Sequence, residues 1–499
     1  MLPDLKDTNP NVQLPAVLAV GFTGHRNLPN EAESRKLLYD LLAEKKRSTS
    51  EVLLGISSIA AGADLLFAES CIALNIPLRV LLPFPVDDFR ADFDPPSWSR
   101  AERVMKQSIS IEVIGNAQQR DERYYECGVE TVLQTQWLIA LWNGEAAHGL
   151  GGTQQIVAFA RRIGKPVVWI HSLTGAVQLC DEKQVPALDV DPELRFLNRL
   201  SSSHAVVNGS PPDIATAWLK KLDDNALQVA PQVRRLAAVP IVCTAIAAVV
   251  SGAASQMHPS SLWVAVGALL GLTAALLPAA LRLGKRQALW VRIRTAAEVS
   301  RSVRALWNVP SQYQVVGPEI LPELSGMVLS LNFLKSQAAP ATTEGVEAFK
   351  SRYLSERLLD QKQYFLTQST KSAEKAKRYR LISKICVIAA IGMSAWMFGA
   401  RALLNPGRAI SGGTWLSLAA SALFQIATIA GAMVVVNDCD RRERRYREIH
   451  DSLKNWEMEL RAFRTWPLVI RAANKIERAL LIELLEWRSL LQNTKMPRN

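Results

Sequence analysis

The sequence predicts an α/β doubly wound (Rossmann-like) domain at the N-terminal end, followed by an α-helical membrane part with four transmembrane helices in two hairpins. Two observations predict this fold class. Between residues 16 and 171, short apolar runs alternate with helical stretches. Between residues 236 and 436, four long apolar segments occur in two close pairs, and basic residues flank each pair.

The α/β prediction depends on a regular alternation of two patterns. Alternation of buried strands with amphipathic helices is typical of βαβ units, which build a mostly parallel sheet covered on both faces. The predicted strands are Ala16–Val20, Glu51–Ile56, Leu78–Leu82, Ile109–Ile114, Leu138–Trp142 and Pro166–Ile170. The predicted helices between them are Glu31–Lys46, Ala63–Leu74, Trp98–Lys106, Tyr125–Gln136 and Thr153–Ile163.

The membrane prediction rests on segment length and on the placement of charge. About 20 largely apolar residues cross the hydrocarbon core of a bilayer, and the four segments are Leu236–Ser255, Leu262–Leu281, Ile385–Ala400 and Thr414–Val436. Arginines and lysines cluster outside each pair and are sparse in the turn within it. By the positive-inside rule, we expect a multi-pass protein of the inner (cytoplasmic) membrane with cytosolic N- and C-termini. The alternative is two buried helical hairpins of a soluble core.

The composition and the charge divide the chain further. The net charge is +12, and much of the excess lies beside the hairpins, which favours the anionic lipid surface over nucleic acid as its partner. The six cysteines form no CxxC pair, which predicts reduced thiols. No histidine or cysteine pattern predicts a metal site or a resident cofactor. The predicted domains are 1–175, a linker at 176–232, a first hairpin with cytosolic helices at 233–340, and a second hairpin at 341–499.

Glycine-rich loops follow several predicted strands. The first strand leads into Gly21-Phe-Thr23-Gly24-His25-Arg26. Glycines let a backbone approach a phosphate closely, and a guanidinium can bind it, at the edge where open α/β sheets bind ligands. An ordinary structural turn is the alternative for this loop.

Three further loops are expected at the same edge. The second strand ends in GISSIAAGAD with Ser57, Gly62 and Asp64, and the third in LPFP followed by Asp-Phe. The last strand ends in Trp-Asn143-Gly, after which Gly151, Gly152 and Thr153 open a helix and could bind a second phosphate at its N-terminus. An ordinary helix N-cap is the alternative for Asp64.

These four motifs, in this order, resemble the SLOG superfamily, and the likeness covers roughly residues 16–171. It implies a doubly wound domain that binds a nucleotide or a derivative such as a cyclic nucleotide or an ADP-ribose derivative. The residues that the resemblance assigns to the ligand are Thr23, Gly24, His25, Arg26, Ser57, Gly62, Asp64, Gly151, Gly152 and Thr153.

The chain departs from the hydrolase branch of that superfamily. That branch has an acid after the glycine loop, where this chain has Gln154, Gln155 and Ile156, and relatives often carry Asp where this chain has Asn143. A glutamine cannot act as a general acid or base. We therefore expect binding without turnover, with Glu126 or Glu130 as the alternative source of chemistry.

The C-terminal part resembles SLATT domains, the two-span effectors of prokaryotic conflict systems. The matching residues are Tyr353-Leu-Ser-Glu-Arg357 through Tyr364 and then Glu477–Trp487, within about 341–493. The resemblance implies spans that assemble into a pore in antiviral defence, and hence a homo-oligomer. It also implies a neighbouring enzyme that produces the signal.

One polar stripe on the last apolar segment is a candidate pore lining. Ser417, Ser421, Gln425 and Thr428 recur at helical spacing. Polar groups in a membrane face a protein interface or water, and hydrogen bonding between helices is the alternative role.

Three functions follow from these patterns. The first is a sensor-effector in which a nucleotide-derived second messenger binds the cytosolic domain and the hairpins form a pore or disrupt the lipid bilayer. The second is a membrane-anchored nucleotide N-glycosidase or phosphoribohydrolase. The third is single-stranded DNA handling at the membrane, for which Arg26, Arg79 and Arg90 are the available cations.

Overall fold

The computed structural model divides the chain into two compact units. The first comprises Met1–Leu222 and Ala296–Gly345, and the second Asp223–Thr295 and Val346–Asn499. The structure describes residues 12–114, 117–145, 150–180, 191–201, 209–257, 283–310, 321–338, 345–403 and 413–493, and five residues between 265 and 272.

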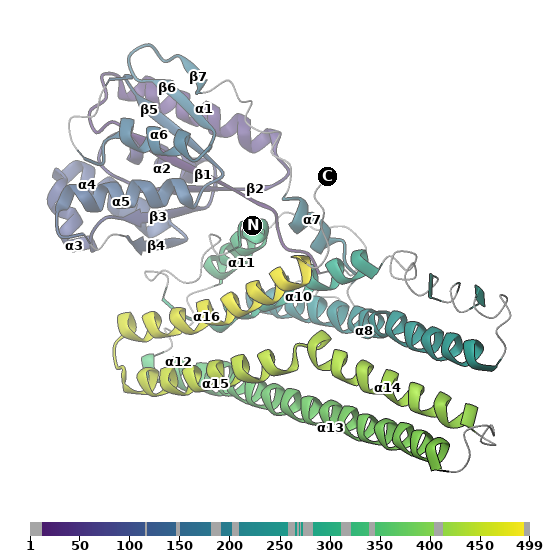
Figure 1. Ribbon diagram of the computed structural model, residues 1–499. Helices are drawn as coiled ribbons and strands as arrows, with labels where there is room; N and C mark the ends of the chain where they lie inside the picture. The colour runs from purple at the N-terminus through teal and green to yellow at the C-terminus, as the bar shows by residue number, and fades with distance from the viewer. Residues whose placement is uncertain are drawn as a thin grey trace. The chain divides into compact units, whose positions relative to one another are not determined.

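A seven-stranded sheet forms the centre of the first unit (Figure 1). Its order is β4-β3-β2-β1-β5-β6-β7, and every neighbouring pair is parallel except β6 with β7. The mostly parallel α/β sheet predicted from the sequence is thereby confirmed. The strands are β1 Val17–Gly24, β2 Val52–Ser57, β3 Leu78–Leu82, β4 Ser110–Val113, β5 Trp137–Trp142, β6 Val167–His171 and β7 Val177–Cys180.

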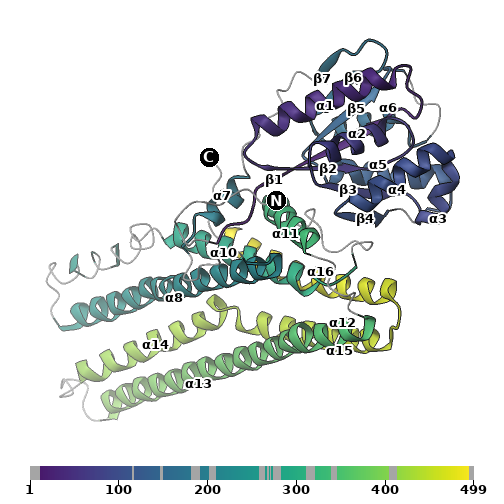
Figure 2. The same ribbon diagram turned by 180° about the vertical axis from the view of Figure 1, so that it is seen from behind.

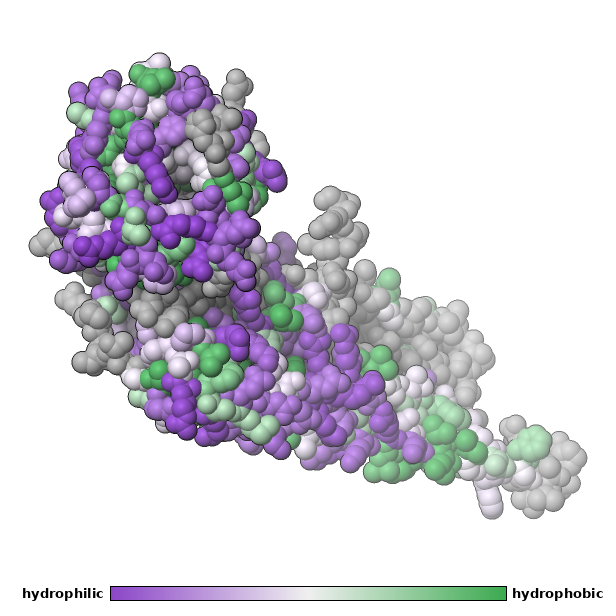
Figure 3. Space-filling view, turned by 90° about the vertical axis from the view of Figure 1, so that its left-hand side faces the viewer, coloured by the Kyte–Doolittle hydropathy of each residue, from purple (hydrophilic) through white to green (hydrophobic). Residues whose placement is uncertain are grey.

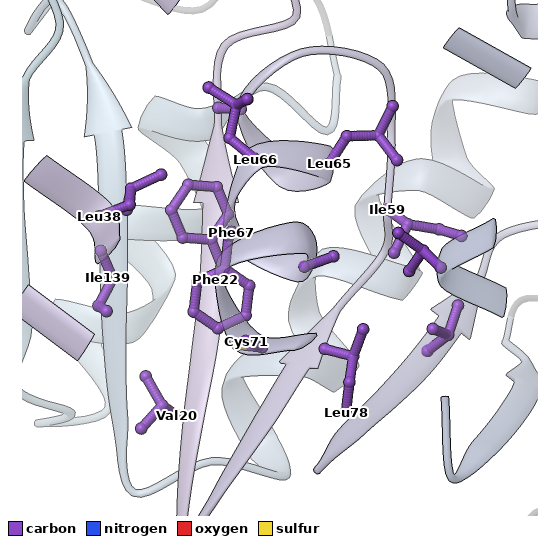
Figure 4. Close-up of a cluster of buried hydrophobic side chains, with 14 of the residues drawn as sticks. Val20, Phe22, Leu38, Ile59, Leu65, Leu66, Phe67, Cys71, Leu78 and Ile139 are labelled. Atoms are coloured by element: carbon purple, nitrogen blue, oxygen red, sulfur yellow. The ribbon is translucent and has the colours of Figure 1, made fainter. Parts of the chain in front are cut away.

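Helices cover both faces of this sheet, as alternating side chains along each strand require. One face packs against α1, α2 and α4, and there Phe22 of β1 stacks on Phe67 of α2 with ring centroids 4.7 Å apart (Figure 4). The other face packs against α5, α6 and α11. The helices of this unit are α1 Glu31–Ser48, α2 Ala63–Ala73, α3 Val86–Phe89, α4 Pro95–Gln107, α5 Arg120–Leu133, α6 Thr153–Arg162, α7 Pro192–Asn198 and α11 Ser325–Gln337.

The helix α11 comes from a distant part of the sequence. Its Leu329 and Phe333 are buried against Val17, Ala19 and Leu54 of the sheet, and the N–H of Gly326 at its start donates to the Asp191 carboxylate, 3.0 Å away. The α/β unit therefore includes a helix that lies about 150 residues beyond the last strand, inside the segment predicted to accompany the first hairpin.

Elsewhere the elements differ from the sequence patterns in detail. The predicted linker at 176–232 contains β7, α7 and the start of α8. The helix α5 begins at Arg120, five residues before the predicted start at Tyr125. Its first turn contains Asp121 and Glu122, which favour a helix N-terminus.

The second unit is helical (Figures 1 and 2). Two of its helical stretches, Val346–Gly399 and Trp415–Ala462, contain windows long and apolar enough to cross a membrane, with mean hydropathies of 1.9 and 2.0. Each stretch overlaps one of the two predicted spans of the second hairpin, Ile385–Ala400 and Thr414–Val436. The elements are α12 Val346–Tyr353, a π-helical turn Leu354–Leu358, α13 Leu359–Leu403, α14 Gly413–Val436, α15 Cys439–Ala462 and α16 Trp466–Asn493; α8 Pro211–Met257 and α10 Leu283–Ala305 each belong partly to this unit.

The apolar side chains of α13 and α14 point outward. Only 6% and 24% of the two windows are buried, whereas a core helix of a soluble protein would be mostly buried. Ile388, Trp396 and Phe398 of α13 are 70%, 72% and 79% exposed. In Figure 3, hydrophobic residues gather toward one end of the helical unit, and hydrophilic residues with smaller hydrophobic patches make up the rest of its coloured face.

The first predicted hairpin is only partly described by the structure. Leu236–Ser255 falls within the helix α8, and most of Leu262–Leu281 lies outside the described residues. Four spans therefore stay a sequence prediction, while two apolar helices are observed.

Candidate functional site

The candidate site lies at the carboxyl edge of the sheet, where the strand order reverses. The chain builds β2, β3 and β4 on one side of β1 and then returns to place β5 on its other side. Ligands of open α/β sheets bind outside the carboxyl ends of the strands at this kind of reversal. Because β1, β2, β3 and β5 run parallel, the four predicted loops leave the sheet at one edge.

A hydrogen bond joins the loops on the two sides of the reversal. His25 Nε2 lies 2.9 Å from Asn143 Oδ1 and 3.2 Å from the Asn143 backbone N. Oδ1 also accepts from the N–H of Glu145, and the Asn143 amide donates to the Glu145 carboxylate. The Asn143 N–H donates to Nε2 when this nitrogen carries no proton, whereas a proton on Nε2 is donated to Oδ1, so the tautomer of His25 decides which of the two hydrogen bonds forms. His25 and Asn143 together fix the positions of the loops that follow β1 and β5.

Asp64 is buried beneath these loops. Its carboxylate accepts hydrogen bonds from the Ser58 hydroxyl and from the backbone N–H groups of Ala60 and Gly24. Burial raises its pKa from 3.8 to about 6, although these hydrogen bonds and the charge of Arg26 lower it. With 5% of its surface exposed, Asp64 connects the β1 and β2 loops from the inside.

The loop between β2 and α2 has an unusual backbone. Gly62, the N-cap residue of α2, has a φ of 92°, and a Cβ there would lie 2.0 Å from the Arg26 carbonyl oxygen. Ile59 has a φ of 50°, a left-handed conformation that is rare for β-branched residues. Strained loops of this kind cluster at functional sites. Ser57 is fully buried, and its hydroxyl accepts from the N–H of Ile59 within the same loop.

The glycine loop before α6 is held by its own glutamine. Gly151 has a φ of 84°, and a Cβ there would lie 2.9 Å from the Tyr125 backbone N. The side chain of Gln155 accepts a 2.8 Å hydrogen bond from the Gly151 N–H. Gly152 is the N-cap of α6 and supplies no side-chain cap, and Thr153 is buried. Gln155 therefore stabilises the glycine loop through a hydrogen bond within it.

Arg26 is an exposed cation at this edge, and an aromatic ring positions it. Its guanidinium lies 4.8 Å from the centroid of the Tyr124 ring. The Tyr124 hydroxyl donates to Asp92, and Arg120 binds the same carboxylate at 2.6 and 3.2 Å. Asp92 is thus bound by protein groups, and among the described residues Arg26 has no ion-pair partner.

The structure brings some predicted residues to the edge and buries others. Thr23, Gly24, His25, Asn143, Gly151 and Gly152 are partly exposed there, whereas Ser57, Asp64 and Thr153 are buried. Tyr124 did not appear among the predicted site residues. Two adjacent tyrosines in the charged start of α5 are the signal that could have indicated it.

The residues of the alternative functions are placed less favourably. Glu130 accepts a 2.7 Å hydrogen bond from Gln134 on the same helix. Arg79 forms a largely buried ion pair with Glu112, and Arg90 lies over Trp98, 5.9 Å from its centroid. Among the described residues, no cluster of three or more His, Cys, Asp or Glu side chains could hold a metal ion.

The predicted polar stripe lies on α14. Thr428 is exposed and donates to the Phe424 carbonyl of its own helix. Ser417, Ser421 and Gln425 are half-buried. The most buried residues of α14 are mainly small ones, which allow helices to approach closely: Ala420, Ala427, Ala430 and Val434.

No model of a known protein family matches the chain, and no curated protein is significantly similar to it.

Proposed function

We propose that the protein is a membrane-bound sensor-effector that binds a nucleotide-derived signal and responds by forming a pore or disrupting the bilayer, in antiviral defence. The hydrogen bond between His25 and Asn143 at the strand reversal carries this proposal. It holds two glycine-containing loops beside an exposed, stacked arginine, an arrangement suited to a phosphate-bearing ligand.

The helical unit supports the membrane part of the proposal. Its α13 and α14 expose isoleucine, tryptophan and phenylalanine side chains over lengths that match a bilayer. Exposed tryptophans near the ends of the two apolar segments, Trp396 and Trp415, fit the interfacial position that this side chain prefers. The ligand would be a cyclic nucleotide or an ADP-ribose derivative made by a neighbouring enzyme, and the active form a homo-oligomer.

The first experiment identifies the ligand and the output. Nucleotides released by denaturing the purified full chain are identified by mass spectrometry and added to dye-filled vesicles that contain the protein. We expect dye release with intact nucleotide, and loss of both binding and release in Arg26→Ala. Arg47→Ala is the matched control, because Arg47 is an exposed arginine in the last turn of α1, before β2 begins at the opposite edge.

Other outcomes select the alternatives. Release of ribose 5-phosphate, lost on changing Glu126 or Glu130, would favour the hydrolase. Retention of single-stranded DNA at physiological salt would favour DNA handling. No dye release at saturating nucleotide, with the protein inserted, would exclude the pore-forming function.

A further inference from the structure

The π-helical turn Leu354–Leu358 joins two helices that pack in different registers. Phe349 and Tyr353 of α12 are fully buried, and so are Leu358 of the turn and, nearly, Phe365 of α13. Tyr353 and Leu358 are five residues apart, and in an α-helix they would point about 140° away from each other. The wider π turn accommodates roughly one extra residue and so keeps both side chains on the buried face.

The two registers belong to different packing partners. On the α12 side, the ring centroids of Phe349 and of Trp466, at the start of α16, lie 5.3 Å apart. On the α13 side, Phe365 lies 5.5 Å from Tyr446 of α15, and the Ser369 hydroxyl donates to the Glu443 carbonyl of α15. The π turn is therefore the joint between these two sets of contacts.

One buried carboxylate closes this joint. Glu477 of α16 is 0% exposed, and Arg357 within the turn donates to its two oxygens at 3.1 and 2.8 Å. The Tyr353 hydroxyl, immediately before the turn, donates to the same carboxylate at 2.8 Å. Nearby, Lys350 Nζ donates to the Phe463 carbonyl at 2.7 Å, so the polar groups of the joint are satisfied within the protein.

We propose that this π turn is a conformational switch, held in its wide form by Glu477, that changes the rotation of α13 relative to α12 when it relaxes to an α-helix. π turns are less stable than α turns and persist where tertiary contacts hold them. Loss of the wide turn would rotate the two registers by roughly 100°, the rotation of one α-helical residue. The helix α13 continues to Leu403 through the exposed apolar segment, so this rotation would turn the predicted span; this regulatory role rests on the proposed function.

A deletion and a substitution test the switch in opposite directions. Deleting Ser355, an exposed residue of the turn, removes the extra residue while both packing registers stay aligned, and this should lock the joint. Glu477→Gln leaves Arg357 buried without its counter-charge, and this should release the joint. Tyr353→Phe, which removes one hydrogen bond, is the milder variant if Glu477→Gln does not fold.

Two controls match these changes. Deleting Thr370, an exposed residue in the regular part of α13, shifts the buried residues by one position and should destabilise the helical unit. Glu459→Gln breaks the exposed ion pair with Lys475 and should change nothing. All variants are made in the full chain, purified in detergent and inserted into vesicles of phosphatidylethanolamine and phosphatidylglycerol.

Hydrogen exchange of residues 346–366 reports on the joint, and dye release without added nucleotide reports on the membrane. We expect Glu477→Gln to accelerate exchange on the order of a hundredfold and to release dye, and the Ser355 deletion to suppress both effects in the double variant. The proposal of a switch would be contradicted if exchange were unchanged in both Glu477→Gln and Tyr353→Phe. It would also be contradicted if the Ser355 deletion did not suppress the faster exchange of Glu477→Gln. If exchange responds as expected and no variant releases dye, the result supports the switch in the π turn and contradicts the pore-forming function.

Discussion

The two units of this chain use the same apolar residue types in opposite ways. In the α/β unit, the strand β5, WLIALW, is buried along its whole length. In the helical unit, α13 exposes Ile385, Ile388 and Ile391 at 57%, 70% and 55%. Large apolar side chains are seldom exposed together in water, so the exposed face of α13 is suited to a non-aqueous surrounding such as lipid.

Their buried carboxylates differ as well. The Asp64 carboxylate of the α/β unit accepts hydrogen bonds from a hydroxyl and from backbone N–H groups, and it forms no ion pair within the described part of the chain. Glu477 of the helical unit is paired with Arg357. A buried carboxylate without a bound counter-charge favours its protonated form, whereas a buried pair fixes the relation between two elements and is costly to break. Asp64 therefore makes the candidate site pH-sensitive, and Glu477 makes the helical joint sensitive to a single substitution.

The largest expected effect compares one core aromatic with one exposed aromatic. Phe22→Ala removes a ring that is 2% exposed and stacked on Phe67, and it should destabilise the sheet by about 3–5 kcal/mol. Phe398→Ala, at 79% exposure, should leave protein packing almost unchanged. Hydrogen exchange of sheet and helix amides in detergent measures both effects. Equal losses of protection in the two variants would contradict the assigned difference in surroundings.

A charge on the exposed face of α13 tests the lipid environment directly. Ile388→Lys should reduce membrane insertion by about 2.5–3.5 kcal/mol, the cost of a lysine at the centre of a membrane helix. Leu173→Lys is the control, because Leu173 is 63% exposed in the α/β unit. The fraction of each variant that resists alkaline extraction from membranes measures insertion. Full retention of Ile388→Lys would show that this face does not lie in lipid.

The strands could be predicted because their patterns are local. A strand buried on both faces, such as β3 LRVLL, is a continuous apolar run, and parallel strands need helices between them. The glycine loop after β1 and the glycine loop before α6 could also be predicted, because both are visible as short local motifs in the sequence. Long apolar segments are equally local, which is why α13 and α14 were predicted from composition and length.

Other features depend on contacts that the pattern does not contain. The periodicity of α11 predicts a helix but not that Leu329 and Phe333 cover the sheet. An acid in the first turn of α2 can face solvent or fold inward, and only the positions of Gly24, Ser58 and Ala60 bring the Asp64 carboxylate inside. The π turn adds one residue to the spacing of buried side chains near Arg357, a change that becomes visible only when α15 and α16 are in place.

The pH dependence of Asp64 sharpens the comparison between the two carboxylates. Its pKa in the folded protein is about 6, raised by burial from 3.8, so between these values the folded state binds a proton that the unfolded state has lost. The stabilisation from this group is fully present below about pH 4 and is lost as pH rises through about 6, by at most roughly 3 kcal/mol. We expect Asp64→Asn to remove this decrease, and Asp87→Asn, an exposed acid of α3, to retain it. Stability of the sheet, followed by hydrogen exchange from pH 4 to 7, makes the measurement. Parallel curves for wild type and Asp64→Asn would contradict the assigned burial.

The smallest expected effect concerns the ring that positions Arg26. Tyr124→Ala removes the stacking surface beneath the guanidinium, a contact worth about 0.5–1 kcal/mol at an exposed site, and should weaken binding of the co-purified nucleotide by roughly two- to fivefold. Tyr124→Phe keeps the ring and loses the hydrogen bond to Asp92, so its affinity should stay close to that of wild type. Calorimetric titration distinguishes the two variants. If Tyr124→Phe weakens binding as much as Tyr124→Ala, Asp92 and not the stacking holds Arg26 in place, and the ligand would then contact the acidic side of this edge.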